Sequence, residues 1–343
     1  MATHHFRPYL ISLGLLLVAL VLSVAAGPVF IPPGTLLRIL ADQLPGFSLP
    51  ADWPKTFSTI LYQIRLPHAA LVLLTGAALG GSGAAYQGLF RNPLADPYLI
   101  GVATGAGLGA VLAMSVEWPR SLFGLYTIPV AAFIGASLTL LIVYSLARVG
   151  NTLPTTTLIL AGVAVSAFAT SLTSLLMLRS NEELRRALGW LLGGSIIGGW
   201  APVLAVLPYI TIGLGILIAS GHALNVLQFG EEQAQQIGLP AERVKTLLLV
   251  SASLTTAAAV AFSGIIGFIG LIVPHVVRML WGSDYRLLLP LSVIGGATAL
   301  LLADLVARLL LAPQVLPVGI VTALVGAPFF LWVLRRARNL AYW

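Results

Sequence analysis

The amino-acid sequence predicts an all-α polytopic membrane protein with about ten transmembrane helices per subunit and both termini in the cytoplasm. Hydrophobic residues make up 58% of the 343-residue chain and charged residues only 8%, and the mean hydropathy is +0.99. A soluble protein of this size could not cover its surface with so few polar groups. Apolar runs of about 20 residues, the length that crosses a bilayer, recur along the whole chain. We therefore expect a single transmembrane domain over residues 1–343.

Composition also excludes several kinds of chemistry. The chain has no cysteine, which rules out disulfide bonds, thiolate metal sites and thiol catalysis. Its formal net charge of +7 fits Lys and Arg residues that anchor cytoplasmic loops. No nucleic-acid partner is expected, because the sequence shows no basic surface with interleaved aromatic residues.

The first apolar run long enough to cross a membrane is Tyr9–Val29. A signal peptide is the alternative, because Ser23–Ala26 offers small residues for cleavage, but the run exceeds the usual apolar core of such peptides. Phe30–Lys55 is expected to be an extramembrane loop with one short interfacial helix beginning near Pro33. The second span is expected to begin at Arg65-Leu66-Pro67, with the proline in the first helical turn.

Glycines spaced for close helix packing occur in the second and third spans. They are Gly76, Gly80, Gly81 and Gly83 in the second span and Gly101, Gly105 and Gly109 in the third. Small residues at such spacing let membrane helices approach closely. Between these spans lies the polar turn Gln87–Pro97, in which Asp96 is placed to cap the following helix.

Seven further apolar segments complete the ten predicted spans. They are Tyr126–Ala147, Pro154–Leu178, Pro202–Ser220, two halves of Thr246–Leu280 joined by a glycine turn, Leu287–Leu311 and Val318–Leu334. Arg179–Arg186 is expected outside the membrane, with Trp190 and Trp200 at its interface. An even number of spans places both termini on one side, and the arginine-rich stretch 335–338 favours the cytoplasm.

The segment 222–245 is one of the few long stretches that cannot lie in hydrocarbon. It contains a short helix-compatible run whose apolar side would comprise Ala234, Ile237 and Leu239, and which Gly238 and Pro240 end. A polar loop with one surface turn is one interpretation. However, Glu232-Gln233-Ala234 followed by Gly238 resembles the Glu-Ala-Ala-x-x-x-Gly pattern of ATP-driven permeases, in which a cytoplasmic coupling helix lies in a groove of the ATPase subunit.

Four motifs resemble signatures of the FecCD/BtuC-type permease family, the membrane subunits of type II ABC importers for iron-siderophore chelates, haem or cobalamin. They are Arg65-Leu66-Pro67, Arg91–Pro97 (RNPLADP), Gly264–His275 (GIIGFIGLIVPH) and Pro317–Ala323 (PVGIVTA). They follow the family order over nearly the whole chain. This favours the interpretation of the 222–245 segment as a coupling helix over that of a polar loop. The resemblance implies a multi-pass protein of a prokaryotic inner membrane. It also implies a homodimer with two ATP-binding subunits on the cytoplasmic side and an extracytoplasmic substrate-binding protein.

The resemblance also assigns roles to individual residues. Asn92 and Leu94 would form a constriction at the cytoplasmic mouth of the translocation path, and Thr155 and Thr156 a second one. The ATPase-coupling residues would be Glu231, Glu232, Ala234 and Gly238. The binding protein would dock on Arg65, His68 and Arg308, although His68 stands where some relatives have a second arginine. The alternatives are helix capping and turn packing for the four path residues, and an ion pair with Asp304 for Arg308.

The chain is not expected to be an enzyme. It has no G-x-x-x-x-G-K-[ST] phosphate-binding motif, and its two lysines, Lys55 and Lys245, lie outside glycine-rich loops. We expect no cofactor in this chain, with ATP and Mg²⁺ bound by the partner ATPase. The spans also lack the cluster of Asp, Glu or His that a secondary transporter, a bare-metal site or an intramembrane enzyme needs. The expected cargo is an intact chelate, a ferric siderophore first, with a corrinoid such as cobalamin, or haem, as the alternative.

Overall fold

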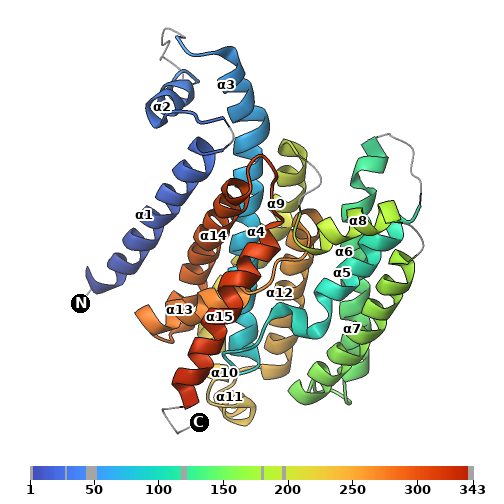
Figure 1. The fold of residues 1–343 in the computed structure, drawn as a ribbon. Coiled ribbons are helices and arrows are strands. Elements are labelled where there is room, and N and C mark those ends of the chain that lie inside the picture. Colours follow the sequence, from blue (N-terminus) through green and yellow to red (C-terminus); the bar gives the residue numbers. More distant parts are fainter. Residues whose placement is uncertain are drawn as a thin grey trace.

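The computed structural model describes residues 3–27, 29–43, 52–116, 122–178, 181–194 and 198–338, and every regular element in these residues is a helix (Figure 1). Seven helices in this part of the chain are long and apolar enough to cross a membrane. Three shorter apolar helices accompany them, at Val102–Met114, Ile269–Trp281 and Val318–Val333. The predicted all-α polytopic fold with about ten membrane segments is thereby confirmed.

The helices fall into two sets by length. The long ones are α1 (Thr3–Ala25), α4 (Leu66–Leu89), α6 (Leu122–Ala147), α7 (Thr155–Met177), α9 (Trp200–Ala219), α12 (Ala241–Ser263), α14 (Tyr285–Leu310) and α15 (Val318–Arg338). The shorter ones are α2 (Pro33–Ala41), α3 (Lys55–Thr59), η1 (Ile60–Arg65), η2 (Pro97–Ile100), α5 (Val102–Met114), α8 (Asn181–Leu191), α10 (Gly221–Leu227), α11 (Glu231–Gln236) and α13 (Ile269–Trp281).

The two ends of the bundle differ. In Figure 1, α1 rises from the N-terminus to the upper end and α15 descends to the C-terminus, so both termini lie in the lower half with α10 and α11. The upper end carries α2 and α3. Helix α2 begins at Pro33, as predicted. Residues 44–51 of the predicted loop lie outside the described part of the chain, as do Arg179 and Ser180 of the predicted charged segment.

The predicted start of the second span is wrong by ten residues. The helix begins at Lys55 and runs through α3, η1 and α4 to Leu89, so Pro67 lies inside it. A proline in a helix interior has no N–H to donate, and the preceding turn must adjust. Here the adjustment is the π-helical turn η1, which ends with the Leu66 N–H bonded to the Leu61 carbonyl, five residues back.

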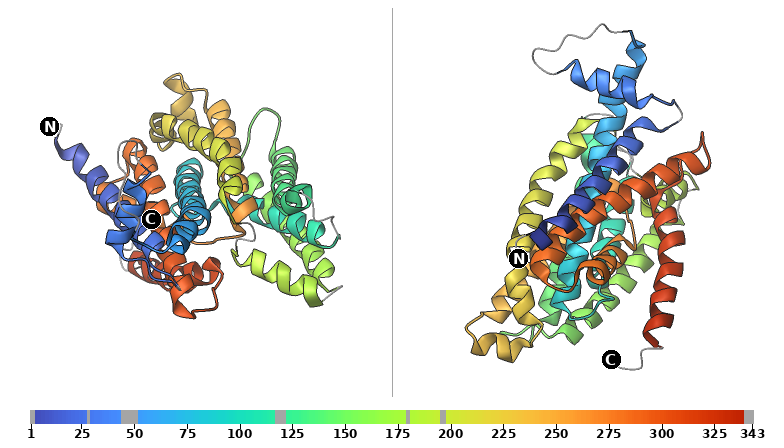
Figure 2. Two further views of the ribbon diagram at one scale, coloured as in Figure 1. Left: turned by 90° about the horizontal axis from the view of Figure 1, so that it is seen from above. Right: turned by 90° about the vertical axis from the view of Figure 1, so that its left-hand side faces the viewer.

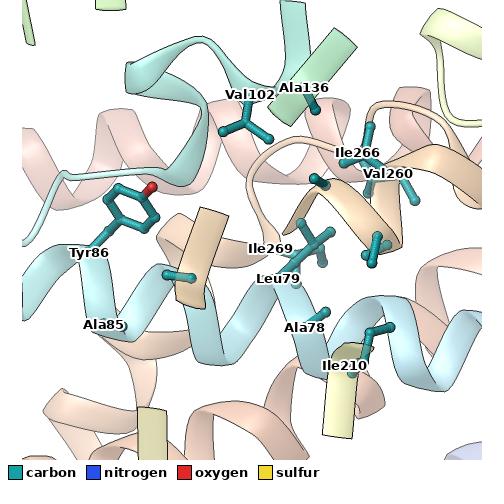
Figure 3. Packing of buried hydrophobic residues seen from close by; sticks show 14 of the residues in the cluster. Ala78, Leu79, Ala85, Tyr86, Val102, Ala136, Ile210, Val260, Ile266 and Ile269 are labelled. Carbon is teal, nitrogen blue, oxygen red and sulfur yellow. The ribbon is translucent and has the colours of Figure 1, made fainter. Parts of the chain in front are cut away.

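Helix α4 is the centre of the bundle and packs on α9, α12, α13 and α14 (Figure 2). A side chain on Gly76 or Gly80 would overlap the main chain of α14 at Ser292 and Gly296. The predicted glycine face is confirmed, because only hydrogen at these positions lets the two backbones touch. Around this contact lies the main hydrophobic core, to which α4 contributes Ala78, Leu79 and Tyr86 and to which α5, α6, α9 and α12 also contribute residues (Figure 3).

Two of the apolar helices are too short to cross a bilayer alone. Helices α5 and α13 have 13 residues each, or about 20 Å at 1.5 Å per residue, against about 30 Å of hydrocarbon. The short helix η2 before α5 and the non-helical turn before α13 are joined by Tyr98, whose hydroxyl donates to the Ile266 carbonyl at 2.9 Å and accepts the Ile266 N–H at 3.3 Å. Asp96 caps η2 by accepting the Tyr98 N–H at 2.8 Å, as predicted.

The predicted interfacial position of Trp190 is wrong. Its side chain is buried in the main core, whereas Trp200 is exposed and its indole N–H donates to the Tyr62 carbonyl. The cause is the close approach of Gly264 to the Trp190 carbonyl, which leaves no room for a side chain at residue 264. This contact brings α8 against the turn between α12 and α13.

Candidate coupling and gate sites

Helix α11 has the shape predicted for the segment that ends at Gly238 and Pro240. Glu231 and Glu232 occupy its first turn. Carboxylates are stabilised there by the N–H groups that have no partner within the helix. At its end, Gly238 has φ +87°, and the Leu239 N–H bonds to the Ala234 carbonyl at 2.9 Å. A left-handed glycine with this six-residue bond is the Schellman arrangement, which stops a helix.

The predicted apolar side of this helix is only partly correct. Ala234 is fully buried and Leu239 is half-buried, but Ile237 is 69% exposed. Ile237 lies beyond the last helical residue, in the turn, so the helical periodicity no longer fixes its direction. Phe229, just before the helix, is 73% exposed. The segment therefore presents two large apolar side chains to its surroundings.

Lys245 connects this helix to the two spans beside it. Its side chain is buried, and its ammonium lies 2.9 Å from Glu231 Oε1 and 3.2 Å from Glu242 Oε1. It also donates to the Leu153 carbonyl at 2.9 Å, and the Leu153 N–H donates to Glu242 Oε2 at 3.0 Å. We call these four residues the Lys245 junction. The junction joins α11 and α12 to the connection that leads into α7.

A second polar contact holds the other end of the 222–245 segment. The Asn225 amide donates to Asp284 Oδ1 at 2.6 Å and its carbonyl oxygen accepts the Tyr285 N–H, so α10 is tied to the start of α14. The Arg286 guanidinium, and to a smaller degree the Asn225 amide, hold the pKa of the Asp284 carboxyl well below its usual range. The 222–245 segment is thus attached to α14 at Asn225 and to α12 at Glu231, and Phe229 between these two residues is exposed.

The first predicted constriction is a compact turn. Leu94 N–H donates to Asn92 Oδ1 at 2.9 Å, and the Asn92 N–H bonds to the Gln87 carbonyl at 3.1 Å. Arg91 has φ +49° at the start of this turn. Asn92 is exposed and Leu94 is half-buried, so both can contact molecules outside the chain.

The second predicted constriction lies at the first turn of α7, which begins at Thr155. Thr155 is half-buried and Thr156 exposed, while Thr157 donates to the carbonyls of Ala147 and Pro154 and closes the α6–α7 connection. The short helix η2, which follows the first region, packs against α7 at Gly162, about two helical turns from Thr155.

The predicted docking residue Arg65 is buried, with 7% of its surface exposed. Its guanidinium donates to the carbonyls of Val24 at 2.8 Å and Ala25 at 2.9 Å, and also to that of Val29. The last carbonyls of a helix have no partner within it and attract cations. Arg65 therefore supplies the missing donors at the end of α1.

Arg308 and His68 belong to the same cluster. Arg308 Nε lies 2.9 Å from Asp304 Oδ2, which confirms the ion pair predicted as the alternative for Arg308, and its other nitrogens donate to Ser23 and Ala26. His68 Nε2 lies 2.8 Å from Asp304 Oδ1. Docking of a partner on these three residues stays a prediction.

Sequence reasoning missed the Lys245 junction. The only local signal was the spacing of Glu242 and Lys245, which places both on one face of a helix. Leu153, the third partner, is 92 residues away in the sequence.

The comparisons with known proteins agree with this geometry. The model of the FecCD transport family matches residues 15–336. An uncharacterized ABC transporter permease of Bacillus subtilis, YvrB, is 40% identical over 97% of this chain and 94% of its own. The cobalamin import permease BtuC of Halobacterium salinarum is 46% identical, covering 82% and 75%. The hemin transport permease HmuU of Yersinia pestis is 42% identical, covering 82% and 84%.

A solved structure shows the same architecture over the full length. A metal-chelate type ABC transporter in an inward-facing conformation superposes with a TM-score of 0.81 at 31% identity, covering 95% of this chain and 99% of that one. The protein is a multi-pass permease of a prokaryotic membrane and not an enzyme, since ATP hydrolysis in such importers resides in a separate subunit. On these grounds the chain belongs to the FecCD transport family.

Proposed function

We propose that this permease imports an intact metal chelate, a tetrapyrrole, as a homodimer driven by two ATP-binding subunits and supplied by a substrate-binding protein. The similarity to a cobalamin permease and a hemin permease, each above 40% identity, supports this proposal. The family resemblance alone ranks a ferric siderophore first. The two named relatives favour a corrinoid, then haem, and the siderophore becomes the alternative.

Uptake by the complete importer tests the cargo. The permease, its ATPase and its binding protein are placed in proteoliposomes, and ATP-dependent entry of cobalamin, haemin and a ferric siderophore is compared. We expect vanadate-sensitive uptake of one tetrapyrrole. Preference for the siderophore would overturn the cargo assignment. Uptake driven by an ion gradient without ATP would instead indicate a secondary transporter and overturn the ATP-driven mechanism.

The exposed apolar residues of the coupling segment support an ATPase contact at this end. Phe229 and Ile237 flank α11. Between them, Glu231 anchors the helix to α12 through the Lys245 junction. Apolar anchors that enter a groove of a partner dominate the affinity of many protein interfaces. A force on α11 would pass through Glu231 and Lys245 to Leu153, two residues before Thr155.

Phe229→Asp should weaken ATPase binding about 30-fold or more, the effect of losing an anchor worth about 2 kcal/mol. Co-purification and titration of the ATPase onto the purified permease measure this. Leu178→Asp is the matched control, because Leu178 is 84% exposed and follows the opposite end of α7. Equal losses in both variants, or none in Phe229→Asp, would contradict the coupling role.

The proposed constrictions can be tested in this cysteine-free chain. In the homodimer, Leu94→Cys or Thr156→Cys should crosslink between the two copies in one nucleotide state and less in another, if these residues close the path. Crosslinking yield with and without ATP and vanadate measures this. Yields that do not change with nucleotide would leave the four residues as turn and cap positions.

A further inference from the structure

A pocket of about 780 Å³ lies between the ends of α6 and α12, and neither the four proposed path residues nor the residues of α11 line it. Its walls are Tyr144 and Arg148 at the end of α6, the turn 151–153, and the first three turns of α12. This size is within the range of about 300–1,000 Å³ found for small-ligand sites. It lies at the same end of the bundle as α11, because Glu242 and Leu153 line it and also belong to the Lys245 junction.

The mouth of the pocket is basic. Arg148 and Arg243 both line it and are exposed, and among the described residues neither guanidinium has a carboxylate partner. Arg148 is held in place by its own turn, since Nε donates to the Gly150 carbonyl at 3.0 Å and NH2 to Asn151 Oδ1 at 3.3 Å. The one carboxylate in the wall, Glu242, is already engaged by Lys245 and the Leu153 N–H. The mouth is therefore complementary to an anion.

The side of the pocket formed by Leu247 and Val250 is apolar, while the turn 151–153 and Thr246 add polar groups to the rest of the wall. Leu247 and Val250 form its wall on α12 and are 47% and 37% exposed. Leu141 and Leu146 of α6 are exposed on the neighbouring span. Exposed leucines along two helices that cross the membrane are the surface that acyl chains cover. An occupant with an anionic head and an apolar tail matches both halves.

We propose that this pocket binds an anionic phospholipid of the cytoplasmic leaflet, with its phosphate between Arg148 and Arg243 and an acyl chain along Leu247 and Val250. Basic pockets between membrane helices on the cytoplasmic side are suited to such head groups. The proposal does not depend on which chelate the permease carries. It does depend on this end of the bundle facing the cytoplasm.

Lipid retention by the purified full-length permease tests the proposal. The protein is incubated with phosphatidylglycerol or phosphatidylcholine, and bound lipid is counted by native mass spectrometry. We expect retention of phosphatidylglycerol over phosphatidylcholine. The double variant Arg148→Gln/Arg243→Gln should bind phosphatidylglycerol about 30-fold more weakly, which corresponds to about 1 kcal/mol for each arginine.

Two further variants make the outcome decisive. Arg7→Gln/Arg335→Gln removes the same charge from exposed positions outside the pocket and should retain the lipid. Val250→Trp fills the apolar wall without changing charge and should reduce retention. Equal binding of both lipids by the unaltered protein, or equal loss in the two arginine pairs, would overturn the proposal. So would a loss of ATPase binding in Arg148→Gln/Arg243→Gln with lipid retention unchanged, since the pocket would then belong to the partner interface.

Discussion

Lys245→Met should destabilise the permease by about 1–3 kcal/mol, the usual effect of leaving one buried acceptor without its donor, because the two carboxylates that pair with Lys245 are partly exposed. The substitution keeps the length and apolar stem of the side chain but removes the ammonium. The buried Leu153 carbonyl then loses its donor, Glu242 keeps only the Leu153 N–H, and Glu231 loses its attachment to α12. A lower thermal unfolding temperature in detergent is the first measurement.

The functional result separates a junction from a simple stabilising contact. Because Glu231 lies in the coupling helix and Leu153 precedes α7, we expect Lys245→Met to keep ATPase binding but to transport fewer molecules per ATP hydrolysed. Lys55→Met is the matched control: Lys55 is exposed and is the other lysine of the chain, so its loss should change stability by less than about 0.5 kcal/mol. Unchanged coupling and unfolding temperature in Lys245→Met would contradict the junction.

Arg65→Met should loosen the end of α1, because it removes the donor from the carbonyls of Val24 and Val29 and leaves that of Ala25 with only the Ile31 N–H. Each buried carbonyl orphaned in this way costs about 1–3 kcal/mol. The residues affected are Val24, Ala25 and Val29. Hydrogen exchange should therefore become faster at residues 20–27, and the unfolding temperature should fall.

The same variant decides between anchoring and docking. If Arg65 only anchors α1, binding-protein affinity keeps its salt dependence, because a buried guanidinium contributes little to long-range attraction. If Arg65 also docks the binding protein, that salt dependence becomes weaker, in addition to the faster exchange at residues 20–27. Arg38→Met is the control at the same end, since Arg38 pairs with Asp52 at 2.9 Å on the exposed surface, where such pairs contribute about 0–1 kcal/mol.

Features that depend on neighbouring residues were predictable from the sequence. Hydropathy located the membrane segments, the glycine spacing of α4 indicated its close contact with α14, and Gly238 marked the end of α11. The Asp304–Arg308 pair followed from its four-residue spacing on a helix. Each of these is decided by local backbone geometry.

Contacts between distant segments were not predictable in the same way. Arg65 bonds to a carbonyl 41 residues earlier, and Lys245 to one 92 residues earlier. Which carbonyl meets which cation depends on how the spans are arranged, and apolar periodicity does not encode that arrangement. For the same reason the sequence gives no sign that the end of α1 offers acceptors to Arg65 and Arg308, and their docking role stays a prediction.

Tyr98 makes two interruptions of the membrane helices mechanically dependent on each other. Its hydroxyl satisfies both main-chain groups of Ile266, in the turn between α12 and α13. Tyr98 itself lies only four residues after Leu94 in the sequence. In hydrocarbon each unsatisfied main-chain group costs several kcal/mol. If η2 moved while the turn before α13 stayed in place, the amide and carbonyl of Ile266 would need another partner, such as water. The two turns must therefore shift as one body, or separate only when water reaches the main chain of Ile266.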